Sequence, residues 1–176
     1  MTGHVERRAF VPMRRLRAGE IALLKTLRLA SLRDAPDAFG RTLADALAQP
    51  ETYWTDMERS ITEPGRHVMF VAEDGDRAVG LVFGIRKSGG TADLGGMWVD
   101  PQARGRGVGR ALGHTVIAWA RSEGFANLVL WVTENNREAR GLYERLGFVA
   151  TGRRDALPSN TALAIVEMRL NLANGW

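Results

Sequence analysis

Closely spaced glycines and arginines near the middle of the 176-residue chain are the residues best suited to hold an anion. Residues 104–110 have the sequence R-G-R-G-V-G-R, and apolar residues at helical spacing follow them. Glycines let successive backbone N–H groups point into one concavity, and the first N–H groups of a helix have no partner within it. Arginines add charge that suits phosphate oxygens. The segment therefore predicts a phosphate-binding turn; the alternative is an ordinary glycine-rich turn before an amphipathic helix.

A strand over 91–99 is predicted to lead into this turn. Asp100-Pro101 ends the strand, because proline cannot donate into a strand ladder. By alternation, Asp93 and Val99 are expected on the same face. Two common phosphate-binding patterns do not fit the turn: the dinucleotide fingerprint needs a small residue where Arg110 or Leu112 stands, and the P-loop lysine is absent.

A different pattern fits. Gln102-x-x-Gly105-x-Gly107, after a strand and at the start of a helix, closely resembles the acyl-CoA loop of the GNAT superfamily of N-acetyltransferases. A second segment is similar to the other signature of that family, N-x-x-A-x-x-x-Y-x-x-x-G-F, and its residues here are Asn136, Ala139, Tyr143, Gly147 and Phe148. Two motifs in the right order are more specific than either alone, and the resemblance covers roughly residues 68 to 170.

The resemblance implies direct transfer of an acetyl group, within a ternary complex, from acetyl-CoA as co-substrate to a primary amine of a small molecule or peptide. Tyr143 would protonate the leaving thiolate; the alternative is a tyrosine of the core. Asn136 would fix the cofactor, unless it only caps a helix. The cofactor-binding residues that the resemblance implies are Met97, Trp98, Val99, Arg104, Gly105, Arg106, Gly107, Val108, Gly109, Arg110, Asn136 and Tyr143.

Deprotonation of the amine calls for a base, because a lysine-type amine has a pKa of about 10.4. Asp93 matches a position where some family members carry a catalytic Glu; its alternative role is a local hydrogen bond in a turn. Glu134, whose alternative role is pairing with a helix dipole, and a water chain are the other candidates. A backbone N–H near Val99 would stabilise the oxyanion, and residues 97–99 would pair with the pantetheine arm like an added strand.

Composition sets broad limits. Hydrophobic residues make up 45% and charged residues 25%, as in soluble globular proteins. The sequence lacks cysteine, which excludes disulfides and thiol catalysis, and it has no metal-binding spacing of histidines. With no long apolar run and no apolar leader, we expect a cytoplasmic protein that binds no membrane and no metal. The net charge of +4 comes mostly from arginines scattered among acidic residues, which predicts no nucleic-acid partner.

The length of the chain predicts one domain over residues 1–176. The expected elements are a strand over 9–16, helical segments over 18–33 and 42–61, strands over 67–73, 78–86 and 91–99, a helix after 107, a strand over 127–132, a helix capped by Asn135, and strands over 149–154 and 162–170. A long exposed loop is expected over 155–160. With the resemblance, this order implies an α+β, three-layer αβα GNAT fold. Its mixed, mostly antiparallel sheet has one parallel βαβ pairing, between the strands near 91–99 and 127–132.

The residues are also compatible with two other functions. A non-catalytic acyl-CoA-binding or sensor module would keep the glycine turn without needing Tyr143, and a nucleic-acid-binding protein would use the arginines. The acceptor wall is expected, by analogy alone, between Ala35 and Trp54. The acidic residues of this region either attract a cationic amine or simply solvate the helices: Asp34, Asp37, Asp45 and Glu51. The identity of the acceptor and a homodimer are left open.

Overall fold

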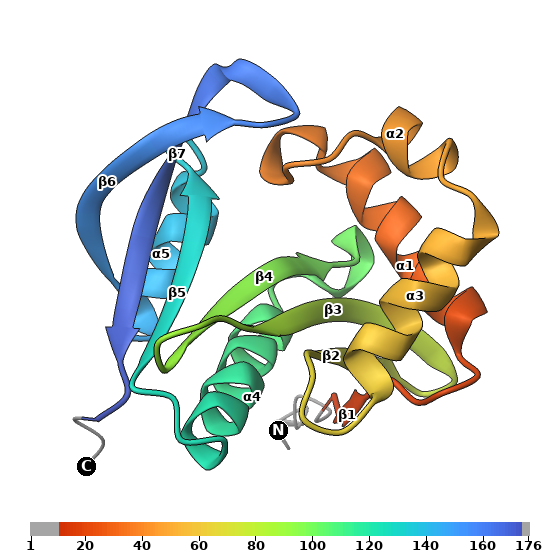
Figure 1. Ribbon diagram of the computed structural model, residues 1–176. Helices are drawn as coiled ribbons and strands as arrows, with labels where there is room; N and C mark the ends of the chain where they lie inside the picture. The colour runs from red at the N-terminus through yellow and green to blue at the C-terminus, as the bar shows by residue number, and fades with distance from the viewer. Residues whose placement is uncertain (1–10, 174–176) are drawn as a thin grey trace, which may run out of the picture.

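The computed structural model describes residues 11–173, and Figure 1 shows a central sheet flanked by helices. Ala9, the predicted start of the first strand, and the terminal Trp176 lie outside the described residues. The elements in chain order are β1 (Met13–Arg15), α1 (Ile21–Asp34), the short helix η1 (Pro36–Ala38), α2 (Leu43–Leu47), α3 (Glu51–Thr62), β2 (Val68–Asp74), β3 (Arg77–Arg86), β4 (Thr91–Val99), the short helix η2 (Pro101–Ala103), α4 (Val108–Ser122), β5 (Asn127–Thr133), α5 (Arg137–Arg145), β6 (Val149–Leu157) and β7 (Asn160–Asn171).

The strands form one seven-stranded sheet in the order β1-β2-β3-β4-β5-β7-β6. Every neighbouring pair is antiparallel except β4 and β5, which confirms the predicted parallel βαβ unit. β4 and β5 are paired only between residues 91–93 and 127–129. Beyond this point the two strands diverge, as Figure 1 shows, and the edge of β4 that faces β5 has no strand beside it.

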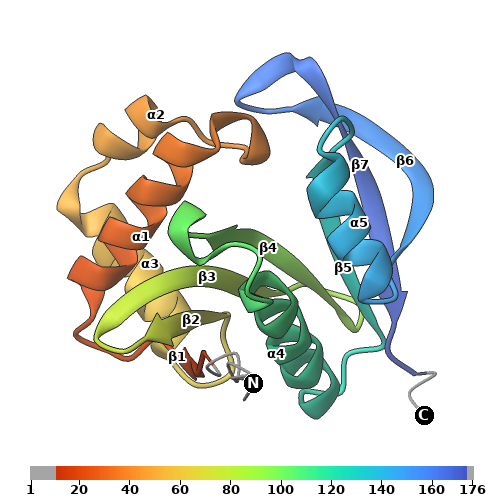
Figure 2. The ribbon, with the colours of Figure 1, turned by 180° about the vertical axis from the view of Figure 1, so that it is seen from behind.

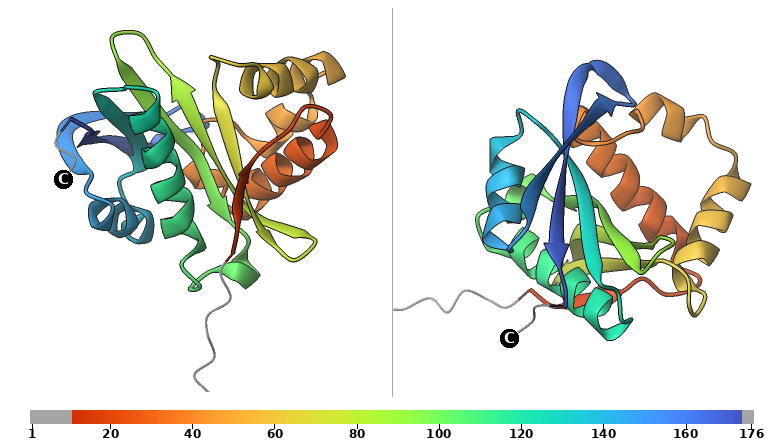
Figure 3. Two further views of the ribbon diagram at one scale, coloured as in Figure 1. Left: turned by 90° about the horizontal axis from the view of Figure 1, so that it is seen from below. Right: turned by 60° about the vertical axis from the view of Figure 1, so that its left-hand side comes forward.

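Helices cover both faces of the sheet, so the structure has the three layers that were predicted (Figures 2 and 3). On one face α4 and α5 pack over a core that includes Leu94, Leu112 and Leu130. On the other face α1, α2 and α3 pack over a second core that includes Leu24 and Trp54. Within residues 11–173, no helix is both long and apolar enough to cross a membrane.

A bulge in β4 overturns the predicted alternation of its side chains. Leu81 pairs with Trp98 and Phe83 with Gly95, so β4 carries one more residue than β3 over this interval. Gly96 takes up the extra residue at φ +59°, and a Cβ at this position would lie 2.7 Å from the Phe83 ring. The expectation that Asp93 and Val99 share a face is therefore wrong: Asp93 pairs with Ile85 on the α1–α3 side, and Val99 packs on the α4–α5 side.

The start of α5 differs from the prediction by one residue. The side-chain oxygen of Asn136, not that of Asn135, accepts the N–H of Ala139 at 3.1 Å and caps the helix. Asn135 lies in the preceding turn and is exposed. Two adjacent asparagines give the same capping signal, so local sequence does not decide between them.

The connection between β6 and β7 is also not the long exposed loop that was predicted. Leu157 pairs directly with Asn160, so Pro158 and Ser159 alone make the turn. The Ser159 hydroxyl donates to the Phe39 carbonyl oxygen at 2.5 Å, and Pro158 packs against Gly40. The hairpin thus fastens the segment after α1 to the far end of the sheet.

Gly141 offers a test of how helix propensity acts on this fold. Its φ lies in the ordinary range, and a Cβ there would meet only the mobile end of Arg145, at 3.3 Å. We expect Gly141→Ala to raise the free energy of unfolding by about 0.5–1 kcal/mol, measured by urea denaturation. Gly152→Ala is the matched control, and it should be destabilising because Gly152 has φ +88°. A less stable Gly141→Ala protein would contradict this account.

Candidate active site

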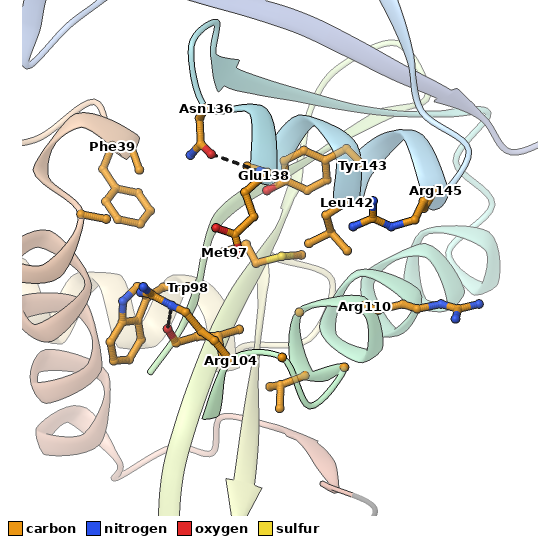
Figure 4. A pocket seen from close by; sticks show the side chains of 18 residues that line it. Phe39, Met97, Trp98, Arg104, Arg110, Asn136, Glu138, Leu142, Tyr143 and Arg145 are labelled. Atoms are coloured by element: carbon orange, nitrogen blue, oxygen red, sulfur yellow. Dashed lines mark hydrogen bonds between the residues drawn. The ribbon is translucent and has the colours of Figure 1, made fainter. Parts of the chain in front are cut away.

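A cavity of about 500 Å³ opens where β4 and β5 diverge, and Figure 4 shows it from close by. It is lined by the glycine turn and the start of α4, by the end of β4, by α5, and by the segment after α1. Of the residues predicted to bind a cofactor, all but Arg106 line it: Met97, Trp98, Val99, Arg104, Gly105, Gly107, Val108, Gly109, Arg110, Asn136 and Tyr143. The structure thus brings both sequence motifs to one site.

The glycine turn has the geometry of an anion site. Gly105 and Gly107 have φ +73° and +83°, a conformation that L-residues with a side chain rarely adopt. Gly107 is the N-cap of α4, and the N–H of Ala111 is the first to bond back into the helix. The preceding N–H groups at the helix start have no intrahelical acceptor, and the helix dipole favours negative charge there. The turn can therefore hold a phosphate-like group.

The four arginines around this cavity differ in their partners. Arg104 pairs with Asp34 and donates Nε to the Val99 carbonyl oxygen at 3.0 Å. Arg106 points elsewhere: its guanidinium binds Asp74 at 2.6 Å, which lowers the pKa of that carboxyl. Arg110 and Arg145 line the cavity, and within residues 11–173 neither makes an ion pair. These two side chains are the ones that can meet a phosphate without first losing a partner.

The edge of β4 that faces the cavity carries backbone N–H groups that no strand occupies. The N–H of Asp100 bonds to the Val79 carbonyl oxygen at 2.8 Å, so this residue points toward β3. Backbone groups alternate along a strand, so those of Val99 and Met97 point the other way, into the gap beside β5. The bond from Arg104 to the Val99 oxygen agrees with this direction. An extended chain could pair with this edge, and an oxyanion could be bound there.

Tyr143 is held at the junction of α5 and the sheet. Its ring packs edge-on against Phe148, with 6.0 Å between the ring centroids, and its side chain lines the cavity. Burial raises the pKa of its phenol to about 12, so the hydroxyl stays protonated at neutral pH. Among the residues described, nothing accepts a hydrogen bond from this hydroxyl. It is therefore a neutral proton donor facing the cavity.

The two carboxylates considered as a base both lie outside this lining. Asp93 sits on the opposite face of β4, two residues before Gly95, with Lys87 Nζ at 3.4 Å from its carboxylate. Burial raises the pKa of Asp93, Lys87 lowers it, and Glu167 adds a smaller increase, so that the result is a raised value. Glu134 lies in the turn before α5, where Arg154 binds it at 2.6 Å. Asp93 is therefore a partly buried carboxylate with a raised pKa, whereas Glu134 is held in an ion pair with Arg154.

A second cavity, of about 300 Å³, lies on the other side of the β4 bulge. Gly95 and Gly96 line it, and the next residues along the strand line the first cavity. Its other walls come from α1, α3, β3 and the residue before β2: Arg28, Tyr53, Met57, Ser60, Ile61, His67, Phe83 and Ile85. Within residues 11–173 no cluster of side chains is arranged to hold a metal ion.

Comparison with known proteins agrees with this geometry. The model of the acetyltransferase (GNAT) family matches residues 29–148, which include both motifs. The chain belongs to the GNAT acetyltransferase family. A mycothiol acetyltransferase of Thermobispora bispora is 34% identical over 131 residues, which are 69% of this chain and 40% of that protein. The chain spans between 40% and 54% of the length of three curated relatives.

Solved structures of GNAT proteins have the same fold. An acetyltransferase of the GNAT family from Streptococcus pneumoniae superposes with a TM-score of 0.75 at 20% identity, over 92% of this chain and 99% of that one. An acetyltransferase from Salmonella typhimurium, solved with its cofactor acetyl-CoA, has a TM-score of 0.72 at 18% identity, over 96% and 97% of the two chains. These likenesses establish the fold.

Several lining residues of this GNAT site were missed from the sequence. On α5 they are Glu138, Ala139, Leu142 and Arg145, and the helical spacing of 139, 142 and 143 was a usable signal. From the segment after α1 they are Ala35, Ala38 and Phe39, which the sequence predicts to lie in an acceptor wall instead. Of the predicted wall over 35–54, Tyr53 alone lines the second cavity. No local pattern distinguishes Ala35, Ala38 and Phe39, because long-range packing brings them to the site.

The acidic residues of this region are held by other protein groups. Asp34 binds Arg104 and accepts Trp98 Nε1 at 2.8 Å, and Glu51 binds Lys25 at 2.9 Å. Asp45 forms the capping box of α2, and Asp37 accepts Asn160 Nδ2 at 3.4 Å. None of the four lines the second cavity. Each of the four therefore has a hydrogen-bond or ion-pair partner within the protein.

The raised pKa of Asp93 predicts a pH-dependent effect on stability. Because the folded state favours the protonated acid, ionisation of Asp93 shifts the balance toward the unfolded state. The stability of Asp93→Asn relative to the unchanged protein should therefore rise as the pH increases from about 4 to 7. Urea denaturation at several pH values checks this, with Asp76→Asn in the exposed β2–β3 turn as the control. A difference that falls with increasing pH would show that the pair with Lys87 dominates.

Proposed function

We propose that the protein transfers the acetyl group of acetyl-CoA to a primary amine, by direct attack within a ternary complex. The observation that carries the proposal is the first cavity, which joins an anion-binding turn, an unpaired strand edge and a protonated tyrosine hydroxyl. The turn suits a pyrophosphate, and the edge of β4 suits the amide groups of a pantetheine arm. The names of the relatives and the acetyl-CoA bound to the Salmonella typhimurium structure support the same choice.

Each residue has a defined part in this reaction. The amine nitrogen attacks the thioester carbon, and the N–H groups of Met97 and Val99 bind the developing oxyanion. The carbon–sulfur bond then breaks, and the Tyr143 hydroxyl gives its proton to the departing thiolate. The proton of the amine passes through water to Asp93, and the products are the N-acetylated amine and free CoA. Return of a proton from solvent restores Tyr143.

A non-catalytic acyl-CoA-binding module would need the glycine turn and the edge of β4 but no proton donor between them. The free hydroxyl of Tyr143 in the cavity favours the enzyme over this alternative. Arg104 and Arg106, two of the arginines around the turn, are paired with Asp34 and Asp74, which does not favour a nucleic-acid surface there.

Acetyl-CoA binding measured by calorimetry tests the location of the cofactor. We expect the unchanged protein to bind acetyl-CoA and Gly107→Ala to bind it at least about 10-fold more weakly, because a Cβ at φ +83° costs about 1–2 kcal/mol and relaxation of the turn misdirects its N–H groups. Gly89→Ala is the matched control. Gly89 has φ +71°, and like Gly107 it has open space around a built Cβ, but it lies in the β3–β4 turn.

Two results would refute this placement of the cofactor. One is a folded, unchanged protein that does not bind acetyl-CoA; the other is equal affinity in the Gly107→Ala and Gly89→Ala proteins. Both variants should lose similar stability, so that thermal unfolding separates the effect of strain from the effect on the site.

Tyr143→Phe tests the proposed acid. The substitution removes the hydroxyl and keeps the ring packed against Phe148, so the fold and the affinity for acetyl-CoA should not change. We expect kcat for acetylation of an accepted amine to fall by about 100-fold, the usual contribution of general acid catalysis. Release of free CoA, followed with a thiol reagent, measures the rate. Unchanged turnover in the variant would remove Tyr143 from the mechanism.

A further inference from the structure

The second cavity lies next to the place where the acetyl group would be transferred, and its lining differs in chemistry from that of the first cavity. Gly95 and Gly96 line it, and Met97 and Val99, which follow on the same strand, line the first cavity. The bulge therefore forms a thin partition with one cavity on either side. An acceptor bound in the second cavity would meet an acetyl group held at the edge of β4.

Arg28 is the charged residue of this cavity. Its side chain extends from α1, its Nη1 atom is buried, and within residues 11–173 that atom has no hydrogen-bond partner. The guanidinium carbon lies 4.8 Å from the centre of the Phe39 ring, and no carboxylate of the described residues forms an ion pair with it. Burial lowers its pKa, but an arginine keeps its charge in a protein. An unpaired buried charge is costly, so Arg28 is a ready site for an anion.

The other polar groups of the cavity also favour an anion. His67 Nδ1 accepts the N–H of Arg86 at 3.0 Å, so the neutral ring carries its proton on Nε2. Burial lowers the pKa of His67, and the neighbouring Arg66, Lys87 and Arg86 lower it further. Tyr53 adds a hydroxyl, and no acidic residue is among those lining the cavity. The wall thus presents hydrogen-bond donors and one full positive charge.

The position of Arg28 determines where an anion bound to it would lie relative to the amine that is acetylated. A Cβ built on Gly96 would be 3.7 Å from Arg28 Nη1, so the guanidinium lies directly beside the bulge. An anion held by Arg28 is therefore close to the site of transfer. An amine that carries a carboxylate close by can occupy both positions at once, whereas a diamine or a lysine side chain offers Arg28 no carboxylate.

The remaining walls are apolar. Met57 and Ile61 project from α3, and Phe83 and Ile85 from β3, around a volume of about 300 Å³. Such a space can hold a branched or aromatic side chain of a ligand, and burial of that side chain stabilises the complex. The positive charge of Arg28 also favours the neutral, nucleophilic form of an amine bound nearby.

We propose that the acceptor is a free α-amino acid with an apolar side chain, whose carboxylate is bound by Arg28. This inference rests on the proposed acetyl transfer and names the class of acceptor for it. The carboxylate pairs with the guanidinium, the α-amine lies at the bulge, and the side chain packs against Met57 and Ile61.

Matched acceptors test the inference directly. L-leucine and L-leucinamide share the side chain and the α-amine and differ in the carboxylate. We expect the unchanged protein to favour L-leucine by about 100-fold in kcat/KM, because a site built for a polar group rejects an analogue that lacks it. The amide has the more readily deprotonated amine, so this preference cannot arise from amine protonation. Arg28→Met should bring the ratio to about 1 without changing the affinity for acetyl-CoA.

Two further variants complete the design. Arg41→Met removes a neighbouring cation that stacks on Tyr53 but does not line the cavity, and it should keep the preference for L-leucine. Arg28→Lys retains the charge without the two-pronged geometry, and it should keep part of that preference. Circular dichroism checks whether each variant is folded. If Arg28→Met does not fold, the preference of Arg28→Lys for L-leucine over L-leucinamide is the test of the inference.

The outcomes distinguish this inference from the proposed function. Equal or better use of L-leucinamide, or an unchanged ratio in a folded Arg28 variant, would overturn the inference while acetyl transfer stands. Failure of acetyl-CoA to bind, or no release of CoA with any amine, would count against the proposed function. In that case calorimetry of L-leucine and L-leucinamide still decides the inference: binding of L-leucine alone, lost in Arg28→Met, supports it, and no binding or equal binding refutes it.

Discussion

The bulge at Gly95–Gly96 is the constraint on which the two cavities depend. A regular strand would keep the alternation from Asp93 to Val99, and it would place the side chains of both on one face. The extra residue turns the second half of β4 over, so that Met97 and Val99 face α4 and α5 and Gly95 faces α1 and α3. Gly96 is needed here for its positive φ and for the closeness of Phe83, which leaves no space for a Cβ. One strand thus lines both cavities, one on each side.

The parts of the fold that the sequence predicted are those set by short-range signals. The buried run of β5, the glycine at the start of α4 and the apolar stripe of α5 all have patterns that packing then respects. The prediction that Asp93 and Val99 share a face assumed strict alternation along β4, and the bulge makes it wrong. Neighbouring glycines have no side chains whose pattern could indicate the change of face. The tightness of the turn at Pro158-Ser159 could not be predicted, because it depends on contacts with Phe39 and Gly40, far away in the chain.

The same distinction holds for the site. The glycine turn, Asn136 and Tyr143 could be predicted because each belongs to a motif whose residues are close in sequence. Phe39 and Arg28 could not, since their importance arises where α1 and the segment after it meet β4. For the four acidic residues of this region the sequence left two roles open, attraction of a cation and solvation of the helices. In the structure helix capping and ion pairs use the carboxylates of Asp34, Asp45 and Glu51 within the protein.

Asp34 shows how the two sides of the sheet are physically linked. Its carboxylate accepts Trp98 Nε1 at 2.8 Å and pairs with Arg104, so the end of α1 is fixed both to β4 and to the glycine turn. Arg28 lies on the same helix, less than two turns earlier. Arg104 lies between the glycine turn and α1, and its ion pair with Asp34 ties the two together. One carboxylate thus connects the lining of the first cavity with the helix that carries Arg28 in the second.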